Sequence, residues 1–170
     1  MPPIETERKY IIKMPSLDSL VCQPGYTESE IEQIYLSSEP TVTHRIRRRS
    51  FSDRVEYTET KKMRVSALSA IEDERTIDRE EYLRLKENIR CGSRVLKKRR
   101  YTVSFLGKIF EIDVYPEWQH HAIMECELGC ESERITPPPF IELVREVTGD
   151  RSYSNAKMSE CFPSEPEAHL

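Results

Sequence analysis

Charged side chains recur at every second position along several stretches of this chain, and each stretch carries mainly one sign of charge. Between positions 98 and 105, Lys98 and Arg100 share one face, while Tyr101 and Val103 share the other. A period of two is typical of a β-strand with one face against apolar neighbours. The alternation therefore predicts a sheet-rich protein in which a few helices pack on the apolar face of the sheet.

The same alternation predicts eight strands joined by short connections, which favours antiparallel pairing. Three short helices are expected after Ser16, after Asp78 and between 140 and 147, where Gly149 is a typical stop. Residues 1–160 are predicted to form one domain and 161–170 an irregular tail. The expected strands are 4–12, 31–36, 41–49, 54–62, 71–77, 98–105, 109–115 and 122–128.

Within these predicted strands, the acidic pairs and the basic pairs lie on different strands. On a solvated face the two signs should mix, because like charges two residues apart repel one another. Two interpretations stay open at this point: charged faces that meet water around an apolar core, or charged faces that converge on one site. The acidic pairs are Glu5/Glu7, Glu72/Glu74, Glu111/Asp113 and Glu125/Glu127, and the basic pairs are Arg45/Arg47 and Lys98/Arg100, with Lys9 and Lys61 as single cations.

The overall charge balance excludes several classes of protein. Among 170 residues, 26 Lys and Arg stand against 30 Asp and Glu, and a net charge of −4 does not favour general binding to nucleic acid or acidic membranes. No run of about 18 apolar residues predicts a membrane span, and the first twenty residues lack the apolar core of a signal peptide. Five cysteines without CxxC spacing indicate reduced thiols in a cytoplasmic protein, with Cys126 and Cys130 as small apolar fillers.

If the charged faces share one cavity, their chemistry defines its ligands. Convergent carboxylates without histidine or cysteine suit hard cations such as Mg²⁺ or Mn²⁺. Arginine and lysine on neighbouring strands supply donors for phosphate oxygens. Carboxylates, a divalent cation and many basic groups together describe a polyphosphate site, and an eight-stranded barrel has room inside for one small ligand.

The order of these motifs resembles the CYTH superfamily of triphosphate tunnel metalloenzymes. Glu5, Glu7 and Lys9 form the ExExK signature of that superfamily, and further matches extend to about residue 158. The resemblance implies a closed eight-stranded antiparallel β-barrel, mainly β with a few helices outside, whose charged faces line a tunnel. The further matches are Gln33-Ile34-Tyr35-Leu36, Arg45-Ile46-Arg47, Thr60-Lys61, Glu72-Asp73-Glu74, Lys98-Arg99-Arg100-Tyr101, Glu111-Ile112-Asp113-Val114, Glu125-Cys126-Glu127 and Tyr153-Ser154-Asn155.

The resemblance also implies roles for individual side chains. The phosphate-binding cations are Lys9, Arg45, Arg47, Lys98, Arg100 and Lys61, for which Lys62 is the alternative. The metal ligands are Glu5, Glu7, Glu74, Asp113, Glu125 and Glu127. As a mechanistic hypothesis, Lys9, Tyr35 and Glu72 act in catalysis. Either a second metal or a carboxylate among Glu72, Asp113 and Glu125 prepares water for attack, and Tyr35 beside Lys9 either assists proton movement or serves only as a wall aromatic.

The expected function is hydrolysis of inorganic tripolyphosphate, as in the short bacterial members of the superfamily, with Mg²⁺ or Mn²⁺ as cofactor. The alternatives are an adenylyl cyclase or a thiamine triphosphatase of the same fold, or a non-catalytic module that binds polyphosphate or a nucleotide. The chain lacks the HF-type motif of the cyclase branch, and Trp118 is its only tryptophan. The expected partner is a small triphosphate, with no nucleic acid and no membrane, and a homodimer stays open.

Overall fold

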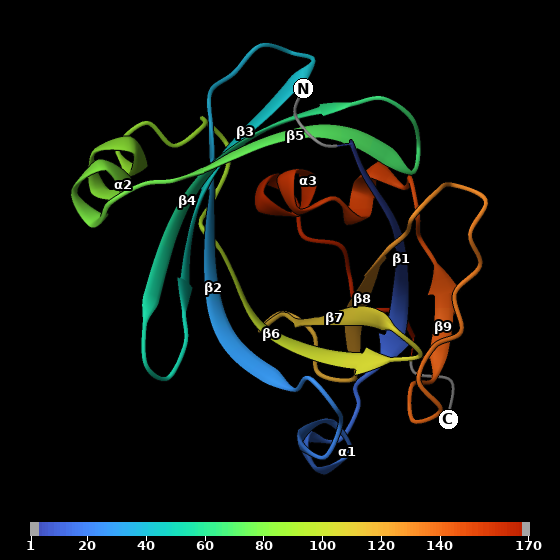
Figure 1. Ribbon diagram of the computed structural model, residues 1–170. Helices are drawn as coiled ribbons and strands as arrows, with labels where there is room; N and C mark the ends of the chain where they lie inside the picture. The colour runs from blue at the N-terminus through green and yellow to red at the C-terminus, as the bar shows by residue number, and fades with distance from the viewer. Residues whose placement is uncertain (1–3, 168–170) are drawn as a thin grey trace.

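The eight predicted strands close into an antiparallel β-barrel (Figure 1). The computed structural model describes residues 4–167. Around the barrel the strand order is β5-β4-β3-β2-β6-β7-β8-β1, and β5 returns to β1 through three residue pairs. The eight strands are β1 (Ile4–Lys13), β2 (Thr27–Leu36), β3 (Val42–Ser50), β4 (Val55–Arg64), β5 (Ser69–Thr76), β6 (Leu96–Phe105), β7 (Lys108–Val114) and β8 (His121–Glu127).

Short helices follow the capping residues that predicted them. The Ser16 side chain accepts a hydrogen bond from the backbone N–H of Ser19, and the Asp78 side chain accepts one from that of Glu81. These contacts confirm the first two predicted helices. No helix within residues 4–167 is long and apolar enough to cross a membrane. The helical segments are α1 (Leu17–Val21), α2 (Arg79–Lys86), a 3-10 turn (Arg151–Tyr153) and α3 (Asn155–Glu160).

The helix predicted between 140 and 147 is wrong, because this segment forms a ninth strand, β9 (Leu143–Glu146). Strand β5 pairs only with residues 4–6 of β1, and β9 pairs with residues 10–12 of β1. Backbone groups on a strand edge favour such pairing, and this tertiary contact outweighs the weak helical spacing of the segment. α3 and the 3-10 turn lie where no element was predicted.

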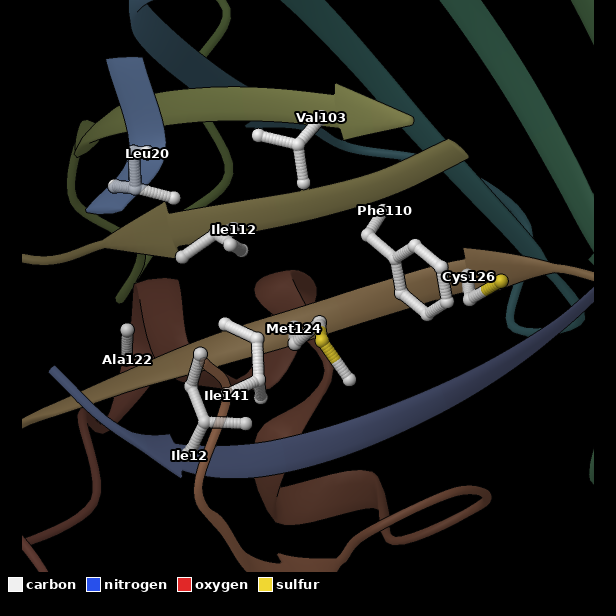
Figure 2. Close-up of a cluster of buried hydrophobic side chains, with 9 residues drawn as sticks. All are labelled: Ile12, Leu20, Val103, Phe110, Ile112, Ala122, Met124, Cys126 and Ile141. Atoms are coloured by element: carbon white, nitrogen blue, oxygen red, sulfur yellow. The ribbon is translucent and has the colours of Figure 1, made fainter. Parts of the chain in front are cut away.

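The largest apolar core lies outside the barrel wall, as Figure 2 shows. Val103, Ile112 and Met124 come from three adjacent strands and pack with Leu20 of α1. Because side chains alternate along a strand, the residues on either side of these positions face the barrel interior. A second outer cluster lies under α2 and comprises Ile34, Leu36, Ile46, Ile77 and Tyr82.

The two cysteines predicted to be apolar fillers differ. Cys126 is buried in the outer core, as predicted. Cys130 is exposed, so that prediction is wrong. Cys130 lies three residues beyond the end of β8, where no sheet face requires it to be buried.

One end of the barrel is closed by α3, which lies against the interior side of the wall (Figure 1). Met158 of α3 packs with Ile11, Leu96 and Ile123, three apolar residues that point inward from β1, β6 and β8. The backbone N–H of Arg94 also bonds to a carbonyl of α3, that of Ser159. The barrel interior is therefore apolar at the end where α3 packs, and the charged part of the interior begins farther along the barrel.

Candidate functional site

The charged faces of the strands point into the barrel. Ile34 and Ile46, which alternate with Tyr35 and Arg45, belong to the outer cluster under α2. Residues paired in register share a face, so the pairing of the strands identifies the remaining inward residues. The inward charged residues include Glu5, Glu7, Lys9, Arg45, Arg47, Arg49, Glu56, Lys62, Glu72, Glu74, Lys98, Arg100, Glu111, Asp113, Glu125 and Glu127.

On β4 the structure corrects the predicted cation. Lys61 pairs in register with Asp73 on the outer face and is exposed, so it does not reach the interior. Lys62 faces inward, and its Nζ lies 3.1 Å from a carboxylate oxygen of Glu72 and 3.7 Å from one of Glu5. The sequence could not separate two adjacent lysines, because β4 carries polar residues at both parities.

Asp113 is at the centre of the most buried charge cluster. Arg100 donates to both of its oxygens, at 2.7 and 2.8 Å, and the Lys98 Nζ lies 2.5 Å from one of them. Burial alone would raise the pKa of Asp113, but the attraction of Arg100 and Lys98 outweighs burial and lowers it. Asp113 thus holds two cations in place in this structure, and its predicted role as a metal ligand stays a prediction.

Lys9 is held by contacts on two sides. Its Nζ lies 2.7 Å from Glu125 and 3.3 Å from the carbonyl of Tyr153. Burial favours the neutral amine, but the attraction of Glu125 and Glu7 outweighs burial and raises the pKa of Lys9. The same contact lowers the pKa of Glu125 against the effect of its own burial. Lys9 is therefore a fixed cation in this arrangement.

Arginines on β3 face carboxylates on β5 across β4. The Arg45 guanidinium lies 2.8 Å from Glu72, and that of Arg47 lies 3.3 Å from Glu74, which also accepts a hydrogen bond from the Thr60 hydroxyl. The Arg45 Nε is buried and has no partner among the described residues. An unpartnered buried donor of this kind is available to a ligand oxygen.

Tyr35 lies in the wall beside these arginines. Its ring is buried, and its hydroxyl accepts a hydrogen bond of 3.0 Å from the Gln33 amide. Burial raises the pKa of Tyr35, although Arg45 and Lys9 act in the opposite direction. Tyr35 is therefore a neutral phenol next to the cations.

Three carboxylates on β1 and the adjacent strand β8 have few positive charges close to them. Glu7 and Glu127 face one another in register, and neither forms an ion pair with another described residue. A hydrogen bond to Glu72, burial and the repulsion of Glu72 raise the pKa of Glu5 to about 8. Like charges in such a position favour a bound cation or a bound proton. Within residues 4–167, however, no three acidic, histidine or cysteine side chains are already gathered as a metal site.

Several inward residues were not assigned a role from the sequence. Arg49 continues the parity of Arg45, and Glu111, which pairs with Arg100, continues that of Asp113. Both could have been found from alternation. Asn155 accepts hydrogen bonds from Tyr115 at 2.6 Å and from Lys98 at 3.5 Å, but it comes from α3, whose position alternation does not predict.

An eight-stranded barrel lined by opposed charges, with one end closed by a helix, defines the chain as having a CYTH-type fold. The inorganic triphosphatase NE1496 has a similar structure, with 25% identity, a TM-score of 0.60, and coverage of 94% of this chain and 97% of that chain. HpAC1 from Hippeastrum (16% identity, TM-score 0.52, coverage 72% and 80%) and a Pyrococcus furiosus protein (19%, 0.56, 75% and 80%) share the fold. No protein-family model and no curated protein sequence matches this chain.

Proposed function

We propose that this protein is a divalent-cation-dependent triphosphatase that hydrolyses inorganic tripolyphosphate. The observation that carries the proposal is the pairing of charges inside the barrel, where arginines and lysines are held by carboxylates from facing strands. The similarity to the inorganic triphosphatase NE1496, over nearly the full length of both chains, agrees with it.

The presence of both positive and negative side chains inside the barrel favours one kind of ligand. A phosphate chain alone would meet strong repulsion from the carboxylates, and a cation alone would meet repulsion from the arginines. A complex of a divalent cation with a triphosphate carries both signs and can replace the internal ion pairs, because phosphate oxygens then take the basic groups. Replacing charged partners by charged partners avoids leaving any buried charge uncompensated.

Glu5, Glu7 and Glu127 are the carboxylates best suited to hold the cation. They lie on adjacent strands, and the pair Glu7 and Glu127 has no cation of its own among the described residues. Carboxylate oxygens are the preferred ligands of Mg²⁺ and Mn²⁺. When bound, the cation would draw electron density from the phosphate oxygens and reduce the charge that water must approach. Glu74, Asp113 and Glu125 remain as further acidic candidates, each paired with at least one basic residue.

The basic side chains would position the substrate. Arg45 and Arg47 are spaced along β3, while Lys9, Lys98 and Arg100 face them from β1 and β6. In-line displacement at phosphorus depends mainly on such positioning and on charge neutralisation. In this protein the fixed guanidinium and ammonium groups would position the substrate and neutralise its charge.

Glu72 is the candidate for orienting the attacking water. It lies between Arg45 at 2.8 Å and Lys62 at 3.1 Å, and these cations keep it ionised. An ionised carboxylate accepts a hydrogen bond from water, which aligns an oxygen lone pair with the phosphorus. Tyr35, a neutral phenol beside Arg45, would contact a phosphate oxygen rather than transfer a proton.

A substrate panel tests the proposal. The purified protein is assayed for phosphate release from tripolyphosphate, ATP and thiamine triphosphate, with Mg²⁺ or Mn²⁺ and with EDTA as the control. We expect the highest kcat/KM with tripolyphosphate and no activity in EDTA. Formation of cyclic AMP from ATP would identify a cyclase instead, and tight triphosphate binding without turnover would identify a binding module.

A further inference from the structure

The segment that closes one end of the barrel also contacts two lysines of the charged interior. The backbone carbonyl of Tyr153 accepts a hydrogen bond of 3.3 Å from the Lys9 Nζ, and the side-chain oxygen of Asn155 lies 3.5 Å from the Lys98 Nζ. Asn155 is the first residue of α3, which lies inside the ring of strands (Figure 1). The closing segment therefore touches two of the cations that are proposed to bind phosphate.

This segment is anchored by contacts that do not involve the two lysines. The side chain of Met158 packs with Ile11 in the apolar layer next to α3. The hydroxyl of Tyr153 accepts a hydrogen bond of 2.7 Å from Arg145, and the Ser154 side chain caps the helix. The position of Asn155 is therefore set by the rest of the fold rather than by Lys98.

The ammonium group of Lys98 has more hydrogen-bond donors than acceptors around it. Its side chain is only 1% exposed, and a lysine ammonium carries three N–H donors. One donor faces Asp113 at 2.5 Å and another faces the Asn155 oxygen. No other acceptor of the described chain lies within hydrogen-bond distance of this group. One N–H of Lys98 is therefore available to a ligand oxygen.

The orientation of the Asn155 amide follows from its two neighbours. Lys98 can only donate, so the oxygen of the amide must face it. The Tyr115 hydroxyl donates to the same oxygen at 2.6 Å, which fixes the amide further. Because the amide is neutral, it holds the flexible lysine side chain without cancelling its charge, whereas Asp113 does both. Two fixed N–H directions determine the third.

Resting on the proposed function, we propose that Asn155 is a positioning residue, which directs the free N–H of Lys98 towards the phosphate group nearest the closed end of the barrel. Lys98 lies two residues along β6 from Leu96, which packs against α3, so it belongs to the first charged layer beyond the apolar end. Asn155 acts through Lys98 and takes no part in the displacement at phosphorus. A fixed donor needs no reorganisation when the phosphate binds.

The first experiment measures KM and kcat for tripolyphosphate with Mg²⁺ in the full-length wild type and in Asn155→Ala. Alanine is compatible with a helix at this position, and Ser154 still caps α3. We expect KM to rise at least about fivefold while kcat stays within about twofold, because a binding contact is weakened. The matched control is Ser152→Ala, an exposed polar residue of the same segment, which should keep KM within about twofold.

A double-mutant cycle separates positioning from a general role in packing α3. In a Lys98→Met background, Asn155→Ala should change KM by less than about twofold, because Asn155 then has no ammonium group to hold. If the fivefold effect persists in that background, Asn155 does not act through Lys98, and the proposal is overturned. Circular dichroism checks that each variant is folded.

If Lys98→Met does not fold, Tyr115→Phe takes its place, since it removes only the hydroxyl that orients Asn155. Tyr115→Phe should raise KM in the same direction, and the double variant with Asn155→Ala should be no worse than Asn155→Ala alone. Effects of the two substitutions that add would contradict the proposal.

Calorimetric titration with tripolyphosphate and Mg²⁺ separates this inference from the proposed function, because it does not depend on turnover. Binding without hydrolysis, weakened about fivefold by Asn155→Ala, would contradict the triphosphatase and support the role of Asn155. Hydrolysis with the same KM in the wild type and Asn155→Ala would do the reverse. A protein that does not bind tripolyphosphate would contradict both.

Discussion

Replacing Asp113 by Asn should destabilise the barrel strongly, although the two side chains have nearly the same shape. The Asp113 carboxylate is fully buried and accepts two hydrogen bonds from Arg100 and one from Lys98. The variant keeps the volume but leaves two buried cations with less negative charge around them. Removing one partner of a buried ion pair costs about 3–5 kcal/mol of unfolding free energy. Arg100 retains Glu125 at 3.4 Å, so we expect a loss of about 3 kcal/mol, near the lower end.

Urea denaturation followed by circular dichroism measures this loss as a shift in the unfolding midpoint at constant m. Asp73→Asn is the matched control, because Asp73 is exposed on the outer face of β5 opposite Lys61. The control should change the unfolding free energy by less than about 0.5 kcal/mol. If Asp113→Asn costs no more unfolding free energy than Asp73→Asn, the buried cations do not depend on the charge of Asp113.

Two further predictions concern the tail and the β3 arginines. Burial disfavours the ionised form of Glu165, but bonds from the backbone N–H groups of Gln119, His120 and His121 outweigh burial and lower its pKa to about 2. Ionised Glu165 therefore stabilises the fold above about pH 4.5. Glu165→Gln should lower the unfolding free energy by about 2 kcal/mol at pH 7, and by progressively less as the pH falls towards 2. Equal decreases in unfolding free energy at both pH values, measured by urea denaturation, would contradict this prediction. Arg47→Ala should raise the KM for tripolyphosphate at least tenfold, roughly the loss of one charge-assisted contact, and equal KM values in Arg47→Ala and Arg48→Ala would remove Arg47 from the site.

Alternation predicted the strands because it reflects a local property. Along β6, Lys98 and Arg100 alternate with Tyr101 and Val103, and the barrel places the first pair inside and the second in the outer wall. In a closed barrel every strand has two neighbours, so one face must point inward along its whole length. Eight strands with sorted charges could therefore be assigned to a common interior once the resemblance had fixed which face pointed inward.

Sequence patterns did not predict the features of the structure that depend on long-range contacts. β9 forms because β1 has a free edge at residues 10–12, and that edge is a property of the closed sheet. Lys61 and Lys62 differ only in parity, and β4 carries polar residues at both parities, so alternation does not show which lysine faces inward. The ion pairs that Asp113 forms with Arg100 and Lys98 likewise depend on how the strands pair. No pattern in the sequence reports these pairings.

The proposed function requires that the carboxylates of β1 bind a divalent cation while the facing basic residues bind a triphosphate. The most direct measurement is phosphate release from tripolyphosphate at increasing Mg²⁺ concentration, for the wild type and for the double variant Glu5→Gln/Glu7→Gln. We expect saturable activation of the wild type by Mg²⁺ and at least a hundredfold lower kcat/KM in the double variant, about 2.7 kcal/mol of transition-state stabilisation. Equal activity of the two proteins at every Mg²⁺ concentration would show that Glu5 and Glu7 do not bind the activating cation.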